Sequence, residues 1–125
     1  MNKADTLRNA AEKLDEVGWI QGSLQNDNGV CMMGAIGLTM GAKLHPIYMD
    51  FVLTDEQRDH LISCGISIGA AIQRIYGDSI EFARDFSDHG IVADFNDSDE
   101  CTKEIAQKLL MSAADAAEFE DDDAA

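Results

Sequence analysis

The sequence holds one arrangement of residues that could support covalent catalysis, and it centres on Cys31. Gln21 precedes this cysteine, and His89 and Asn96 follow it. Cys31 stands at the start of a predicted helix, where the helix dipole lowers the pKa of a thiol. Cysteine catalysis needs a thiolate, a base beside it and a donor for the oxyanion. The pattern raises the hypothesis of a hydrolase or transferase with Cys31 as nucleophile and His89 as base.

The order Gln, Cys, His, Asn is the chain order of papain-like cysteine hydrolases, but their local motif around the cysteine is absent. His89 also lies in a polar Asp88-His89-Gly90 turn, and a chain with three cysteines and three histidines can supply this order by chance. Because free cysteine is usually buried, we expect Cys31 to pack beneath Trp19. We therefore favour a binding protein over an enzyme.

Trp19 and Gln21 come directly after Gly18, which is placed to end a helix. A single tryptophan at such a position most often fills the core, and a glutamine can bond to nearby backbone. Contact with a ligand is the alternative for both side chains.

The segment Asp94-x-Asn96-x-Ser98 begins like a calcium-binding loop, but the sixth and twelfth positions lack the required Gly and Glu. The cysteines form no C-x-x-C pair, and the histidines lack ligand spacing. We predict no metal site and no cofactor. A weak divalent site among Asp94, Asp97 and Asp99 is the alternative.

Acidic residues are concentrated in the C-terminal part of the chain. Residues 78–125 contain fifteen acidic and three basic residues, which gives −12 of the total net charge of −15. Such a field repels nucleic acid and anionic lipid and attracts basic surfaces. A solvated, solubilising face is the simpler interpretation. The sharper one is a set of carboxylates that mimic backbone phosphates, and its expected contacts are Asp94, Asp97, Asp99, Glu100 and Glu104.

The elements that must position these residues are mostly helical, because the chain has one proline and long stretches without breakers. Apolar residues at helical spacing predict an amphipathic helix that starts near Asn2 or Asp5 and ends at Gly18. Residues 19–30 form a connector, and its Asp27-Asn28-Gly29 turn signal allows a short hairpin.

A second helix is expected over residues 31–40, followed by a connector over residues 42–53. Its glycines Gly34 and Gly37 indicate the close approach of another helix, since glycine in a helix costs about 1 kcal/mol relative to alanine. A capping box at Thr54 opens a further helix. That helix either breaks near Gly65 or continues as one piece to Tyr76.

Further along, Asp78 starts a helix toward Phe86, and residues 87–97 are expected to be a loop or a short extended piece. Asp97 caps the last helix, in which apolar residues recur regularly to Ala117. We predict an all-α fold, a compact bundle of five or six short helices with one possible short hairpin near residues 19–30. Residues 1–117 would form a single domain, and residues 118–125 a disordered acidic tail.

Three elements together resemble an uncharacterised family of small proteins from actinobacteria and bacteriophages. They are the Gly18-Trp19-Ile20-Gln21-Gly22 segment, the Cys31-x-x-Gly34-Ala35 helix and the Asn96-Asp97 pair before the final helix. Residues 42–90 show no such likeness, and Phe95 replaces the expected tryptophan. The resemblance implies a small helical domain and a phage context, and it implies no activity.

The working hypothesis is an acidic, cytoplasmic protein-interaction module that engages a basic partner. The partner would be a nucleic-acid-binding host protein, and the module would be a phage-encoded inhibitor or nucleic-acid mimic in an anti-defence role. No signal peptide or membrane segment is recognised, and no direct contact with nucleic acid or membrane is expected. A small-ligand-binding module or a homodimer with small-residue contact faces is the remaining alternative.

Overall fold

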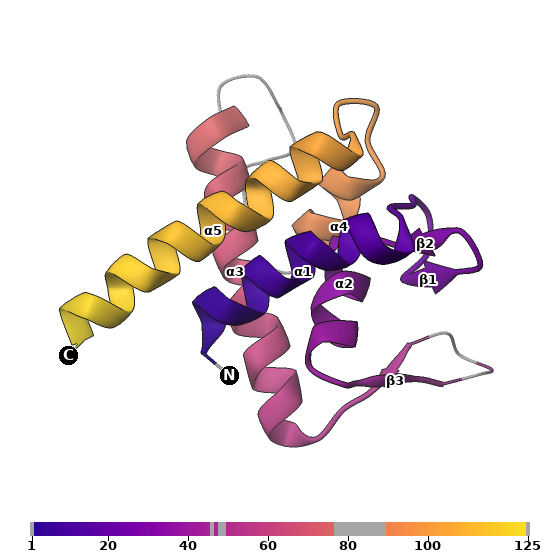
Figure 1. The fold of residues 1–125 in the computed structure, drawn as a ribbon, viewed down its shortest axis with the longest axis horizontal. Coiled ribbons are helices and arrows are strands. Elements are labelled where there is room, and N and C mark those ends of the chain that lie inside the picture. Colours follow the sequence, from indigo (N-terminus) through magenta and orange to yellow (C-terminus); the bar gives the residue numbers. More distant parts are fainter. Residues whose placement is uncertain (1, 46, 48–49, 77–89, 125) are drawn as a thin grey trace.

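The computed structural model describes residues 2–45, 47, 50–76 and 90–124. Within these residues the chain forms five helices and two small antiparallel sheets of two strands each, which confirms the all-α class with a short hairpin. Helices α1 (Lys3–Val17) and α5 (Lys103–Ala124) lie side by side and run in opposite directions, and α3 (Asp55–Tyr76) crosses behind them (Figure 1). The core lies where these three helices meet α2 (Met32–Thr39).

Helix α1 begins and ends where the sequence predicts. The Asn2 side chain accepts a hydrogen bond from the Asp5 backbone N–H at 2.8 Å, which satisfies a free donor of the first turn. Leu7 and Leu14 are fully buried on the inner face. Gly18 has a φ of +94°, and an added Cβ would lie 2.4 Å from the Asn28 carbonyl oxygen. Glycine is therefore needed both for the conformation and for the hairpin's close approach.

The predicted hairpin is present. Strand β1 (Gln25–Asn26) pairs with β2 (Gly29–Val30) in antiparallel register, and Trp19 forms an isolated bridge with Val30. The two glycines of α2 are used inside the molecule. A Cβ at Gly34 would lie 2.0 Å from the Leu24 carbonyl oxygen, and one at Gly37 would lie 2.0 Å from the Phe51 ring. The two glycines therefore allow close approach of a loop and of an aromatic ring, and not of another helix as predicted.

Residues 42–53 hold a second hairpin that the sequence analysis treats as a plain connector. Strand β3 (Lys43–Leu44) pairs with β4 (Phe51–Val52). Beyond it, α3 is one continuous helix, so the alternative with a break near Gly65 is wrong. The capping box at its start is confirmed, because Thr54 and Gln57 exchange backbone-to-side-chain hydrogen bonds at 3.0 and 3.1 Å.

The prediction of a loop or short extended piece over residues 87–97 is wrong where the structure describes this segment, because Gly90–Asn96 form helix α4. Val92 and Phe95 are fully buried three residues apart on this short helix, and this packing outweighs the weak local signal. The helix predicted from Asp78 toward Phe86 lies outside the described residues.

Helix α5 begins later than predicted. Its cap is Thr102, whose hydroxyl accepts from the Ile105 N–H at 3.2 Å, whereas Asp97 lies in the preceding turn. The predicted apolar stripe is buried down to Ala117. The helix continues to Ala124, past the residue where a tail was expected to start, while the division into domain and tail stays a prediction. No described helix is long and apolar enough to cross a membrane.

Candidate functional site

Asn96, at the end of α4, joins three segments that are distant in sequence. Its side chain is 1% exposed. The Oδ1 atom accepts from the Trp19 indole N–H at 2.8 Å and from the Met32 N–H at 3.1 Å. The Nδ2 atom donates to the Ile20 carbonyl at 3.0 Å. A buried amide with both ends bonded positions the Trp19 segment and the start of α2.

The Gln21 side chain continues this arrangement on the outer side. Its Nε2 donates to the carbonyls of Asn96 and Ser98, both at 2.9 Å, and the Gly22 N–H donates to Asp97 Oδ1 at 2.7 Å. Gln21 thus bonds to backbone as the sequence suggests. The indole N–H is the only polar group of the Trp19 side chain, and it already donates to Asn96. A ligand at Trp19 could therefore contact only the apolar surface of the ring.

Cys31 is the N-terminal cap of α2, as predicted, and its sulfur accepts from the Gly34 N–H at 3.3 Å. The predicted direction of its pKa is wrong. Burial raises the pKa of the thiol, and the nearby Asp97 carboxylate adds to this. The thiol is therefore protonated at neutral pH, which opposes a role as nucleophile. The proposed base, His89, lies outside the described residues.

The other two thiols are also buried and unpaired. Burial raises the pKa of Cys64 and of Cys101 to about 12. Among the described residues, no group of three or more His, Cys, Asp or Glu side chains is arranged to hold a metal ion. The divalent site considered among Asp94, Asp97 and Asp99 gains no support.

Five carboxylates surround the turn from α4 to α5, and we call them the acidic surface. All of them are exposed: Asp94, Asp97, Asp99, Glu100 and Glu104. In the part of the chain that the structure describes, none of the five is held in an ion pair with a lysine or arginine. Asp97 is the one that also bonds inward, to Gly22. Asp94 lies in α4, Glu104 lies in α5, and the other three lie in the turn between these helices.

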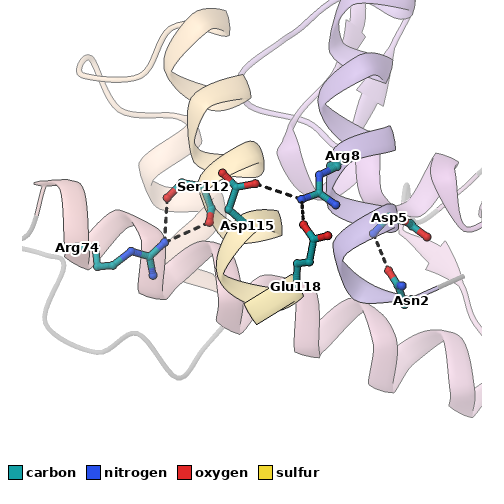
Figure 2. A network of polar contacts seen from close by, with 7 residues as sticks. All are labelled: Asn2, Asp5, Arg8, Arg74, Ser112, Asp115 and Glu118. Carbon is teal, nitrogen blue, oxygen red and sulfur yellow. Dashed lines mark hydrogen bonds and ion pairs between the residues drawn. The ribbon is translucent and has the colours of Figure 1, made fainter. Parts of the chain in front are cut away.

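A second polar region follows the seam between α1 and α5. Arg8 pairs with Asp115 at 3.1 Å and also with Glu118 (Figure 2). Lys103 pairs with Asp15 at 2.8 Å at the other end of the seam. These pairs connect the two antiparallel helices, and they join residues that lie about a hundred positions apart.

His60 on α3 is partly buried. Its Nε2 lies 2.8 Å from the Thr6 hydroxyl, which itself donates to the Asn2 carbonyl. This contact joins α1 to α3, and the tautomer of the imidazole sets which of the two groups donates. An open groove of about 430 Å³ lies beside this contact, lined by Thr39, Met40, Glu56 and Gln57 as well as Thr6 and His60.

Comparison with known families places the chain in one of them. A family model described as "Family of unknown function (DUF6197)" matches residues 1–116. The chain belongs to this family, DUF6197. No curated protein and no solved structure matches the chain significantly.

The DUF6197 match confirms the resemblance to a family of unknown function, and it includes residues 42–90, where the sequence analysis found no likeness. In this DUF6197 chain the three elements that carry the resemblance are in direct contact. Asn96 bonds to Trp19 of the first element and to Met32 of the second. A buried hydrogen-bond network centred on Asn96 therefore joins these three elements.

Sequence reasoning missed the seam and the His60 groove of this DUF6197 chain. Arg8 and Asp115 carry no local signal that they meet, because each is an ordinary charged residue on the outer face of its helix. The contact between Thr6 and His60 likewise joins two helices. Only the tertiary packing of α1 on α3 and α5 creates these sites.

Proposed function

We propose that this protein is an acidic interaction module that binds a basic protein through the acidic surface. One observation carries the proposal: five exposed carboxylates lie on and beside the turn from α4 to α5, and the described residues provide no cation paired with them. Carboxylates in this state are free to accept charge-assisted hydrogen bonds from lysine and arginine. The net charge of −15 favours encounter with a cationic partner over long range.

The turn that presents the acidic surface is held firmly. The Phe95 carbonyl accepts from the N–H of Ser98 at 3.0 Å and from its hydroxyl at 2.7 Å. The Cys101 N–H donates to the Ser98 carbonyl at 3.3 Å, and Asn96 fixes the turn from inside. Carboxylates on a fixed turn lose less conformational entropy on binding than those on a mobile tail.

A nucleic-acid-binding protein is the partner class that this chemistry fits best. Its basic groove is built for phosphates, and spaced carboxylates offer the same charge and the same acceptors. Direct binding of nucleic acid is disfavoured by like charge. An inhibitor that occupies such a groove, as phage-encoded proteins acting against host defences would, is the finer form of this proposal.

Affinity capture from a cell lysate, with elution in a salt gradient, tests the proposal. The first variant reverses three charges of the acidic surface, Asp99→Lys, Glu100→Lys and Glu104→Lys. The matched control, Asp55→Lys, Glu56→Lys and Asp59→Lys, changes the net charge equally on exposed residues near the start of α3.

The expected result is a partner that wild-type protein and the control retain, that the first variant loses, and that duplex DNA displaces. Equal loss in both variants would reduce the effect to net charge. A partner that neither salt nor duplex DNA displaces would contradict the proposed mimicry of nucleic acid.

A further inference from the structure

A groove runs along the seam between α1 and α5, and the proposed function leaves it unused. Its volume is about 380 Å³. The lining residues come from both helices: Arg8, Ala11, Glu12, Asp15, Gln107 and Met111. Gln107 donates from Nε2 to the Ala11 carbonyl at 3.2 Å and so ties the two helices together within the groove.

The groove has an apolar component that faces solvent. Met111 lines the groove and is 41% exposed. Phe119 lies beyond the lining, two turns later on α5, and is 69% exposed. Methionine adapts its shape easily and is over-represented on surfaces that bind helices.

Carboxylates border these apolar residues. Glu12 is exposed, and the side chains of Asp115 and Glu118 keep 74% and 59% of their surface exposed although both pair with Arg8 (Figure 2). With Asp15 the seam holds four carboxylates against two paired cations, Arg8 and Lys103. Exposed ion pairs contribute little to stability, so an incoming cation can exchange with the existing one.

We propose that this groove binds a basic amphipathic helix of the partner protein. Apolar side chains of that helix cover Met111 and Phe119, and its lysines and arginines face Glu12, Asp115 and Glu118. Helix-in-groove recognition uses this combination of apolar anchors and a charged rim. The inference rests on the proposed function, because it requires a basic partner. It adds which segment of that partner binds to the groove.

Charge complementarity selects this occupant over the others. A second copy of this chain carries the same charge of −15 and would be repelled, which disfavours a homodimer across this face. Nucleic acid is repelled for the same reason. A helix with lysine on one side and leucine on the other satisfies both components of the groove.

The test uses a synthetic leucine–lysine peptide of about five helical turns, and a peptide of equal composition in scrambled order. Binding is measured by fluorescence anisotropy against wild-type protein, Met111→Gln and Ile66→Gln. Ile66 lies on α3 and is 42% exposed, so it matches Met111 in exposure. Circular dichroism checks that each variant keeps its helices.

We expect the amphipathic peptide to bind more tightly than the scrambled one, and Met111→Gln to weaken it about tenfold, as loss of one apolar anchor does. Ile66→Gln should leave the affinity unchanged. Equal binding of the two peptides, or equal loss in the two variants, would overturn the groove. A dimer in sedimentation equilibrium that Met111→Gln abolishes would overturn it too, by assigning the face to a second copy.

Lysate capture separates this inference from the proposed function. A partner that Met111→Gln retains fully, and that the triple reversal at the acidic surface loses, would refute the groove while the proposed function stands. A specific partner lost by both variants supports both. If neither variant loses any partner, both proposals fail.

Discussion

The indole N–H of Trp19 donates to the side-chain oxygen of Asn96 at 2.8 Å across 77 positions of sequence. This bond lies where the hairpin segment, the start of α2 and the end of α4 converge. The same oxygen also accepts from the Met32 N–H, so one buried amide satisfies donors from two other segments. Asp97, the next residue, belongs to the acidic surface, so the position of this carboxylate depends on the contact.

Replacing Asn96 by leucine should strongly destabilise the protein. The change leaves the buried Met32 N–H, the partly buried Trp19 indole N–H and the Ile20 carbonyl without their partner. A buried group left unsatisfied costs about 1–3 kcal/mol. We therefore expect a loss of about 3 kcal/mol or more in the free energy of unfolding, measured by urea titration. Trp19→Phe removes the indole donor and keeps the bond from the Met32 N–H. We expect loss of the indole bond to lower the free energy of unfolding by about 1 kcal/mol. Equal stability of Asn96→Leu and wild type would show that solvent replaces the network.

Gly34→Ala should be more damaging than Gly37→Ala, although alanine favours a helix by about 1 kcal/mol over glycine. At Gly34 the new methyl group meets the Leu24 backbone carbonyl, which belongs to the hairpin segment and cannot turn away. At Gly37 it meets the end of the Phe51 ring, a side chain that can shift. Thermal unfolding should show a clearly lower midpoint for Gly34→Ala. The reverse order would mean that the loop yields more easily than the ring.

Much of the fold follows from local signals that act within a few residues. Asn2 and Gly18 mark the ends of α1, the capping box at Thr54 marks the start of α3, and the Asp27-Asn28-Gly29 turn marks the first hairpin. These devices satisfy the free backbone groups of a helix or fix a turn, so they are readable without tertiary structure.

Elements that depend on packing were missed. Helix α4 is short, and burial of Val92 and Phe95 in the core stabilises it. The true start of α5 at Thr102 was also missed, because Asp97 offers an equally good capping side chain earlier in the sequence.

The candidate sites divide in the same way. The exposed carboxylates around the turn could be named from charge alone, since surface charge is a property of composition. The direction of the pKa shift of Cys31 could not be predicted in this way. Burial raises this pKa more than the helix dipole lowers it, and burial depends on the packing of the whole core. The Arg8 contacts in the seam likewise require knowing which helices are neighbours.

Acidification should destabilise the protein through His60. Partial burial lowers the pKa of its imidazole below the ordinary value of 6.5, and the Lys3 ammonium adds to this. The unfolded chain then binds the proton more readily than the folded one, so the contribution of His60 to stability is present above pH 6.5 and is lost as pH falls through its folded pKa.

His60→Gln should reduce this part of the pH dependence. The measurement compares the urea midpoints of the two proteins at about pH 7.5 and pH 5.5, on either side of the ordinary histidine value. Wild type should lose more stability on acidification than the variant does. Equal losses of stability in wild type and His60→Gln would show that groups other than His60 cause the pH dependence.

The thiols should react slowly in the folded protein, and this separates binding from cysteine catalysis most directly. Burial raises the pKa of Cys31, and it brings Cys64 and Cys101 to about 12. The thiolate is the reactive form, so alkylation by iodoacetamide at neutral pH should be far slower than in urea. Mass spectrometry of a time course identifies which cysteine is modified, and Cys31→Ser provides the matched control. Rapid alkylation at Cys31 alone, absent in that variant, would revive the nucleophile and contradict the protonated thiol that its burial predicts.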